Sequence, residues 1–116
     1  MARSVNDLID DMLIAIDDIR TFTGDMEMAA FLSSPRTDRR TYLAVIAAFT
    51  QLAEAARALP DDFRDRHPQV EWKLISGMRN LLVHEYFRAD AEVIWLTAKS
   101  TKLDVLQSAL KSALDR

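Results

Sequence analysis

A short stretch near residue 80 contains the side chains of this sequence that are best suited to phosphate chemistry. Arg79, Asn80 and His84 supply a guanidinium, an amide and an imidazole, and Tyr86 adds a phenol. His84 is one of two histidines in the sequence, and Tyr86 is one of two tyrosines. Apolar residues separate these groups at helical spacing, which predicts that they lie on one helix. This mixture favours a site that binds a phosphate and reacts with it.

Cleavage of RNA without a metal ion requires three functions. A base removes the proton of the 2′-hydroxyl, a charged group stabilises the transition state at phosphorus, and an acid protonates the leaving oxygen. Histidine titrates near neutral pH, so His84 is a candidate base or acid. Arg79 offers a permanently charged fork to phosphate oxygens, and Asn80 would orient the imidazole or donate to the phosphate. Acid and base usually require two groups, and the motif has one histidine; a symmetric dimer that brings two copies together would resolve this difficulty.

The helix that contains these residues is predicted to run from about Val70 or Trp72 to Tyr86. With a turn of 100° per residue, its apolar side chains fall on one side and its polar groups span a broad arc on the other. Asn80 and His84 form an i,i+4 pair on one stripe, and Arg79 lies close to Tyr86. The alternative interpretation is a helix that ends in a polar turn facing solvent, without any catalytic role.

Two more residues are candidates for supporting this site. Gly77 lies on the polar arc, where glycine costs about 1 kcal/mol relative to alanine, and we expect it to allow close approach of another backbone or of a ligand. Glu54 is a lone acid in an apolar stretch. It is either a boundary residue at the edge of the core or a support for Arg79 and His84, and the sequence leaves both roles open.

The composition predicts one helical domain. The sequence has 116 residues, of which 49% are hydrophobic, and only two glycines and three prolines, which is typical of a helical bundle. A net charge of −3 implies that any contact with nucleic acid uses a local basic patch. The absence of cysteine excludes disulfides and thiolate metal sites. No apolar run approaches the ~20 residues of a membrane span, and the N-terminus is unlike a signal peptide, so we expect a cytoplasmic protein.

Apolar spacing predicts a first helix that begins near residue 5. Ser4 or Asn6 is expected to cap it, and Asp7 lies in the first turn, where the helix dipole favours an acid. Gly24 is predicted to end this helix in the left-handed conformation that suits glycine.

Two pairs of acidic residues on this first helix raise the question of a metal site. Asp10 and Asp11 form one pair, and Asp17 and Asp18 form the other. Adjacent residues diverge by about 100° on a helix, so each pair points in two directions. We therefore interpret them as a solvated face.

Two further helices are predicted in the first half of the chain. Asp25 is a candidate cap for a short helix over Met26–Leu32, which residues 33–35 are expected to end with a proline. A long helix begins within residues 36–41 and ends at Pro60.

The remaining elements follow from turn residues. Residues 61–68 are predicted to form a polar connection with one helical turn at most. His67 precedes a proline, which favours extended backbone, so we interpret it as a loop residue and not as a catalytic one. Asp90 is expected to cap the last helix, which has a possible bend at residues 99–101.

The order of these residues resembles a known family. Arg79-Asn80-x-x-x-His84 matches the R-x4-H signature of the HEPN superfamily, and residues 75–87 resemble its HepT subfamily, whose signature extends to R-x4-H-x-Y. The resemblance covers nearly the whole chain. The other segments that resemble the subfamily are Ile16–Ile19, Phe22–Gly24, Glu54–Ala56, Leu59–Arg64, His67-Pro68, Trp72, and Asp90 with Val93–Trp95.

The resemblance implies an all-α fold, with residues 1–116 forming one HEPN-type up-and-down bundle of four to five helices. It implies a homodimer in which two motifs face one cleft, and a metal-independent ribonuclease toxin with RNA as its substrate. It also implies a partner, a minimal nucleotidyltransferase antitoxin that transfers AMP to the tyrosine matching Tyr86. The alternative is a non-catalytic helical module that binds a nucleotide or the nucleotidyltransferase.

Two positions depart from the family pattern. The family often has a basic residue where Leu81 stands and a glycine where Glu85 stands. Both changes are expected to lower RNA affinity or to change which RNA is cut. Arg88 and a basic cluster at residues 36–40 are candidates to compensate, although a solvated helix start is the more ordinary role for that cluster.

Overall fold

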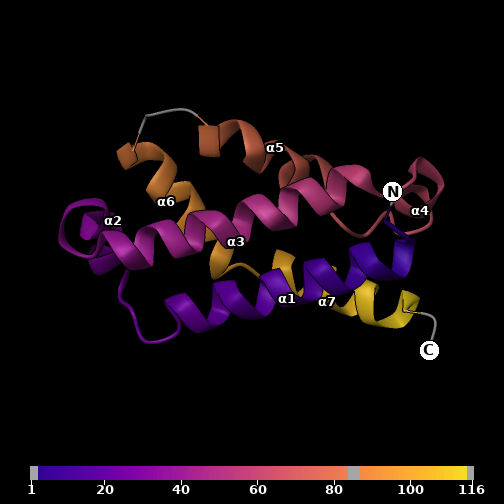
Figure 1. Cartoon of the computed structure of the whole chain (residues 1–116), viewed down its shortest axis with the longest axis horizontal. Helices are drawn as coiled ribbons and strands as arrows, with labels where there is room; N and C mark the ends of the chain where they lie inside the picture. Colours follow the sequence, from indigo (N-terminus) through magenta and orange to yellow (C-terminus); the bar gives the residue numbers. More distant parts are fainter. Residues whose placement is uncertain (1–2, 84–86, 115–116) are drawn as a thin grey trace.

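The computed structural model consists of helices joined by short connections (Figure 1). It describes residues 3–83 and 87–114, and for residues 80–83 and 87–90 it describes the backbone alone. Within these ranges there is no strand, so the predicted all-α fold is confirmed. The helices are α1 (Val5–Thr23), α2 (Met28–Thr37), α3 (Arg39–Ala58), α4 (Asp61–Asp65), α5 (Trp72–Val83), α6 (Phe87–Ala98) and α7 (Thr101–Ala113).

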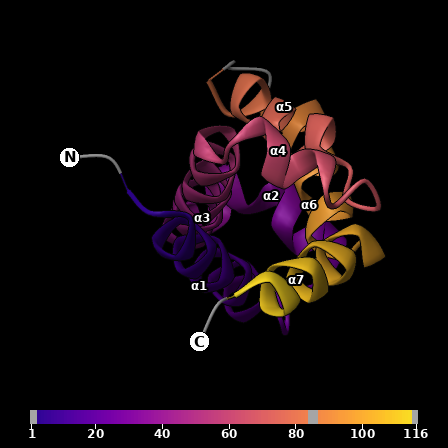
Figure 2. The ribbon, with the colours of Figure 1, turned by 90° about the vertical axis from the view of Figure 1, so that its right-hand side faces the viewer.

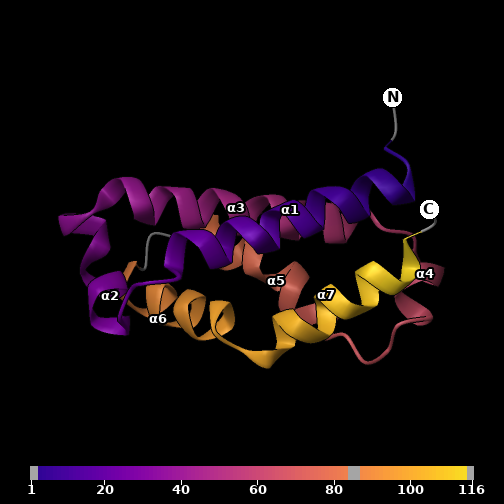
Figure 3. The same cartoon turned by 90° about the horizontal axis from the view of Figure 1, so that it is seen from below.

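Helix α3 lies between α1 and α5 and runs antiparallel to both (Figures 1 and 2). Helices α6 and α7 follow one another along the opposite side, from the end where α2 lies to the end where α4 lies (Figure 3). None of the described helices is long and apolar enough to cross a membrane. The largest side chains of the core that are fully buried are Ile9, Met12, Ile16, Ile19, Phe31, Phe49, Leu52, Ile75, Met78, Ile94, Leu103 and Leu106.

The ends of α1 are stabilised in two different ways. Ser4 is its N-cap, as one of the two predicted candidates, and its hydroxyl accepts from the Asp7 backbone N–H at 3.0 Å. At the other end the helix stops at Gly24 as expected, but the predicted left-handed cap is wrong, because Gly24 has φ −52°. The terminal carbonyl of Thr23 accepts from the backbone N–H of Met26 at 3.1 Å and from the ammonium group of Lys99 at 3.0 Å. A local backbone hydrogen bond and a side chain from the connection between α6 and α7 therefore complete this helix end.

Helix α2 differs from its prediction at both ends. It begins after Glu27 and not after Asp25, and it continues through Pro35, which was expected to end it. A proline inside a helix leaves the carbonyl four residues earlier without its backbone donor. That carbonyl belongs to Phe31, and it accepts a hydrogen bond from the buried hydroxyl of Ser34. The local side chain thus supplies the donor that the proline lacks.

The second half of the chain contains more helices than predicted. Residues 61–65 form the short helix α4, which agrees with the single turn allowed there, and His67 lies in the loop that follows, as predicted. Asp90 does not cap the last helix, because α6 already begins at Phe87. The bend expected at residues 99–101 is a complete break, since Ser100 caps a new helix by accepting from the Lys102 N–H.

Replacement of Ser34 by alanine should destabilise the protein by about 1–3 kcal/mol, since it leaves the buried Phe31 carbonyl without a donor. Urea unfolding followed by circular dichroism measures the change. Ser33→Ala is the matched control, because its exposed hydroxyl bonds the Ala30 carbonyl beside solvent. Equal losses for the two variants would contradict the proposed role of Ser34.

Candidate functional site

Helix α5 is fixed against α3 by its apolar side. Ile75 and Met78 are buried in the core, with 2% and 1% of their surface exposed. These residues belong to the side that the helical wheel assigned to the core. Arg79 follows Met78 by one position, and its side chain is 45% exposed. The packing of α5 therefore places the predicted phosphate-binding guanidinium at the surface.

An ion pair joins this arginine to α3. Nε of Arg79 lies 2.8 Å from Oε1 of Glu54, and the Glu54 side chain is 52% exposed. A carboxylate that accepts from Nε fixes the plane of the guanidinium, whose two terminal nitrogens have further N–H donors for another acceptor. The arrangement presents an oriented, charged fork beside the α3–α5 contact.

The sequence left two roles open for Glu54, at the edge of the core or in support of the site. The structure places its carboxylate on the surface in direct contact with Arg79. The contact links two residues 25 positions apart in the chain, and no periodicity in the sequence indicates it. Whether Glu54 also acts on His84 stays a prediction.

The other predicted site residues are described only in part. Asn80 lies in the helical backbone of α5, but its side chain lies outside the described residues, as do His84 and Tyr86. The same holds for the two positions that depart from the family pattern, Leu81 and Glu85, and for the candidate cation Arg88. Their side chains also lie outside the described part of the chain.

Gly77 lies on α5, two positions before Arg79. No described atom lies within 4 Å of a Cβ built at this position. The described part of the chain therefore does not itself approach Gly77 closely. A ligand or a second copy of the chain remains the predicted reason for a glycine there.

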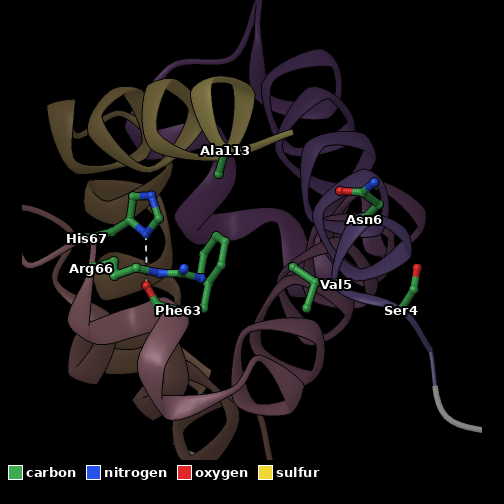
Figure 4. Close-up of a pocket in the computed structure, with 7 residues that line it drawn as sticks. All are labelled: Ser4, Val5, Asn6, Phe63, Arg66, His67 and Ala113. Carbon is green, nitrogen blue, oxygen red and sulfur yellow. Dashed lines mark hydrogen bonds between the residues drawn. The ribbon is translucent and has the colours of Figure 1, made fainter. Parts of the chain in front are cut away.

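The second histidine lies elsewhere. Nδ1 of His67 donates to the Phe63 carbonyl at 2.8 Å, and the two rings stack at 4.5 Å between centroids. His67 lines a pocket of about 700 Å³ where α1 begins and α7 ends (Figure 4). These contacts anchor the loop after α4 and agree with a structural role.

The described residues give no indication of a metal centre. Among the side chains that the structure describes, no three of His, Asp or Glu gather in a way that could hold an ion. The paired aspartates of α1 point in different directions, as helical geometry requires. One of them, Asp11, forms an ion pair with Arg3 at 2.7 Å.

Comparison with known proteins places the chain in a family. The family model described as "Ribonuclease HepT-like" matches residues 12–113. The chain belongs to the HepT-like ribonuclease family. This result confirms the resemblance inferred from the motif and from the segments around it.

Individual members of the HepT-like family are also similar. The chain is 37% identical over 99 residues to "Probable ribonuclease HepT" of Thermococcus cleftensis, covering 85% of this chain and 86% of that protein. It is 38% identical over 93 residues to "Putative RNase MJ0127" of Methanocaldococcus jannaschii, covering 80% and 74%. No solved structure gives a significant match.

Replacement of Glu54 by glutamine should change the free energy of unfolding by less than about 1 kcal/mol, because an ion pair between half-exposed groups contributes little to stability. The ¹⁵N NMR signal of Arg79 Nε should nevertheless move, since its acceptor loses its charge. Glu92→Gln is the control, an exposed acid on α6. An unmoved Arg79 signal, or a loss well above 1 kcal/mol, would contradict this interpretation.

Proposed function

We propose that this member of the HepT-like ribonuclease family is a ribonuclease toxin that cleaves RNA without a metal ion. The supporting observation is the Arg79–Glu54 ion pair, which holds the arginine of the R-x4-H motif at the surface in a fixed orientation. An oriented guanidinium beside solvent is suited to a phosphate that binds from outside. Membership of a family described as ribonuclease supports RNA as the substrate.

In this proposal His84 transfers protons, and Arg79 stabilises the charge that develops on the phosphate. His84 follows Arg79 by five positions, so it would lie just beyond the last residue of α5. Asn80 orients the imidazole or donates to the phosphate. A homodimer supplies the second proton-transfer group, because two motifs that face one cleft provide one histidine as base and the other as acid.

Glu54 acts here as a positioning residue for Arg79. A carboxylate on Nε directs the terminal nitrogens without occupying them, so that they meet the phosphate in the correct plane. The negative charge of Glu54 also makes the surroundings less attractive to phosphates that do not engage Arg79 directly. Both effects favour productive binding over loose binding.

The proposal includes control by a nucleotidyltransferase antitoxin. Transfer of AMP to the Tyr86 hydroxyl would add bulk and negative charge near Arg79. The charge would repel an RNA phosphate and the bulk would obstruct the site. A chain with this modification would keep its fold and lose its activity.

His84→Ala protein should lose RNA cleavage by at least about a hundredfold and keep its helical content, because general acid–base catalysis contributes 10²–10⁴-fold. Cleavage is measured on labelled RNA with EDTA present. His67→Gln, which changes the other histidine, is the control and should retain cleavage. Parent-like cleavage by His84→Ala would refute the catalytic assignment. Absence of cleavage by the parent dimer, with tight binding to the nucleotidyltransferase, would favour the non-catalytic module.

Coexpression with the nucleotidyltransferase should add the mass of one or more AMP units to the parent protein and none to Tyr86→Phe. Intact mass spectrometry measures the difference. Tyr42→Phe is the matched control, because Tyr42 is the only other tyrosine and is 6% exposed. An AMP adduct on Tyr86→Phe would show that another residue accepts the group.

A further inference from the structure

A groove opens at the start of α5, the helix that also carries Arg79. It has a volume of about 890 Å³ and lies where α4 and its loop meet α5, at one end of the bundle (Figures 1 and 2). Ser76 lines it and precedes Arg79 by three positions, which is about 4.5 Å along the helix axis. The groove is lined by Asp61, Arg64, Asp65, Pro68, Val70, Glu71, Trp72, Lys73, Leu74 and Ser76.

Two contacts hold the indole of Trp72 in the apolar part of this groove. The indole Nε1–H of Trp72 donates to the His67 carbonyl at 3.0 Å, and its ring meets Phe63 edge-on with 6.2 Å between centroids. Trp72 and Leu74 are half-buried, so both keep a surface in contact with solvent. A fixed aromatic and aliphatic surface is suited to the flat face of a nucleobase, and stacking on it tolerates any base.

The charges around the groove do not suit a phosphate. The lining residues include three carboxylates and two cations, Arg64 and Lys73, so their charges sum to −1, which disfavours an anion. Two of the acids are engaged, since Asp61 pairs with Arg64 and Glu71 pairs with Lys102 at 3.0 Å. Asp65 forms no ion pair with any residue in the described part of the chain. Its carboxylate accepts hydrogen bonds only, so it matches the exocyclic amino groups of adenine, cytosine and guanine. Uracil has no amino group, and its single N3–H donor lies between two carbonyl oxygens that repel a carboxylate.

We propose that this groove is a nucleobase subsite, which rests on the proposed ribonuclease function. When Arg79 binds the phosphate at the cleaved bond, the neighbouring nucleotide lies within reach of the groove. Its base stacks against Trp72 and Leu74, and an amino group of the base donates to Asp65. The subsite therefore favours an amino-bearing base over uracil at one position next to the cut.

The test compares short RNAs that differ only in the base on either side of the mapped cleavage position. We expect the parent protein to prefer RNAs with an amino-bearing base at one of these positions over RNAs with uracil there. The preference should be roughly tenfold in cleavage efficiency, which is the contribution of one hydrogen bond to a charged group. Asp65→Asn should reduce this ratio towards one, because an amide also donates to uracil oxygens. Asp62→Asn is the matched control, an exposed neighbour on α4 that does not line the groove.

A binding measurement separates this inference from the proposed cleavage. The same RNAs are bound to His84→Ala protein, and fluorescence anisotropy gives the ratio of affinities with and without Asp65→Asn. If the parent cuts no RNA, the proposed function fails and this ratio alone tests the subsite. Equal affinity and cleavage for all bases, or the same effect from Asp62→Asn and Asp65→Asn, would overturn the subsite whatever the catalytic result.

Discussion

Close packing on two sides of α3 is the constraint on which the rest of the structure depends. Residues Ala48, Ala53, Ala55 and Ala56 are almost completely buried, and their small side chains let neighbouring helices approach. Helix α1 covers one side and α5 the other, so α3 fixes both (Figure 2). The rotation of α5 about its axis follows from this contact. That rotation buries Met78 and leaves the next residue, Arg79, at the surface.

The candidate site is therefore built from the seam between α3 and α5. One helix supplies the carboxylate that orients the guanidinium, and the other supplies the guanidinium and the start of the groove. Glu54 and Arg79 belong to helices whose other faces are buried in the core. The packing of those faces therefore determines where the two side chains lie. A site on rigid elements of this kind needs little reordering when a ligand binds.

The sequence predicted the features that depend on neighbouring residues, such as helices and the cap of α1. It missed contacts between side chains that are far apart in the chain. Composition and apolar spacing predicted the all-α fold and the core side of α5, and the residue types before the first helix left Ser4 and Asn6 as its two candidate caps. The sequence did not indicate that α2 would continue past Pro35. The Ser34 hydroxyl donates to the Phe31 carbonyl, and this hydrogen bond replaces the backbone donor whose loss usually ends a helix at a proline. Nor could the sequence choose between the two roles of Glu54, because the contact with Arg79 arises only when α3 and α5 are packed together.

The hydrogen bond from Lys99 to the Thr23 carbonyl has a consequence for the order of folding. It joins residues 76 positions apart, and the contacts of Arg20 with Asp104 and Gln107 span 84 and 87 positions. Contacts between distant residues close large loops and form late. The end of α1 is thus contacted by residues that follow it by more than 70 positions in the chain. We expect the end of α1 to be less stable until Lys99 and α7 dock against it, so the stability of this helix end depends on residues far along the chain.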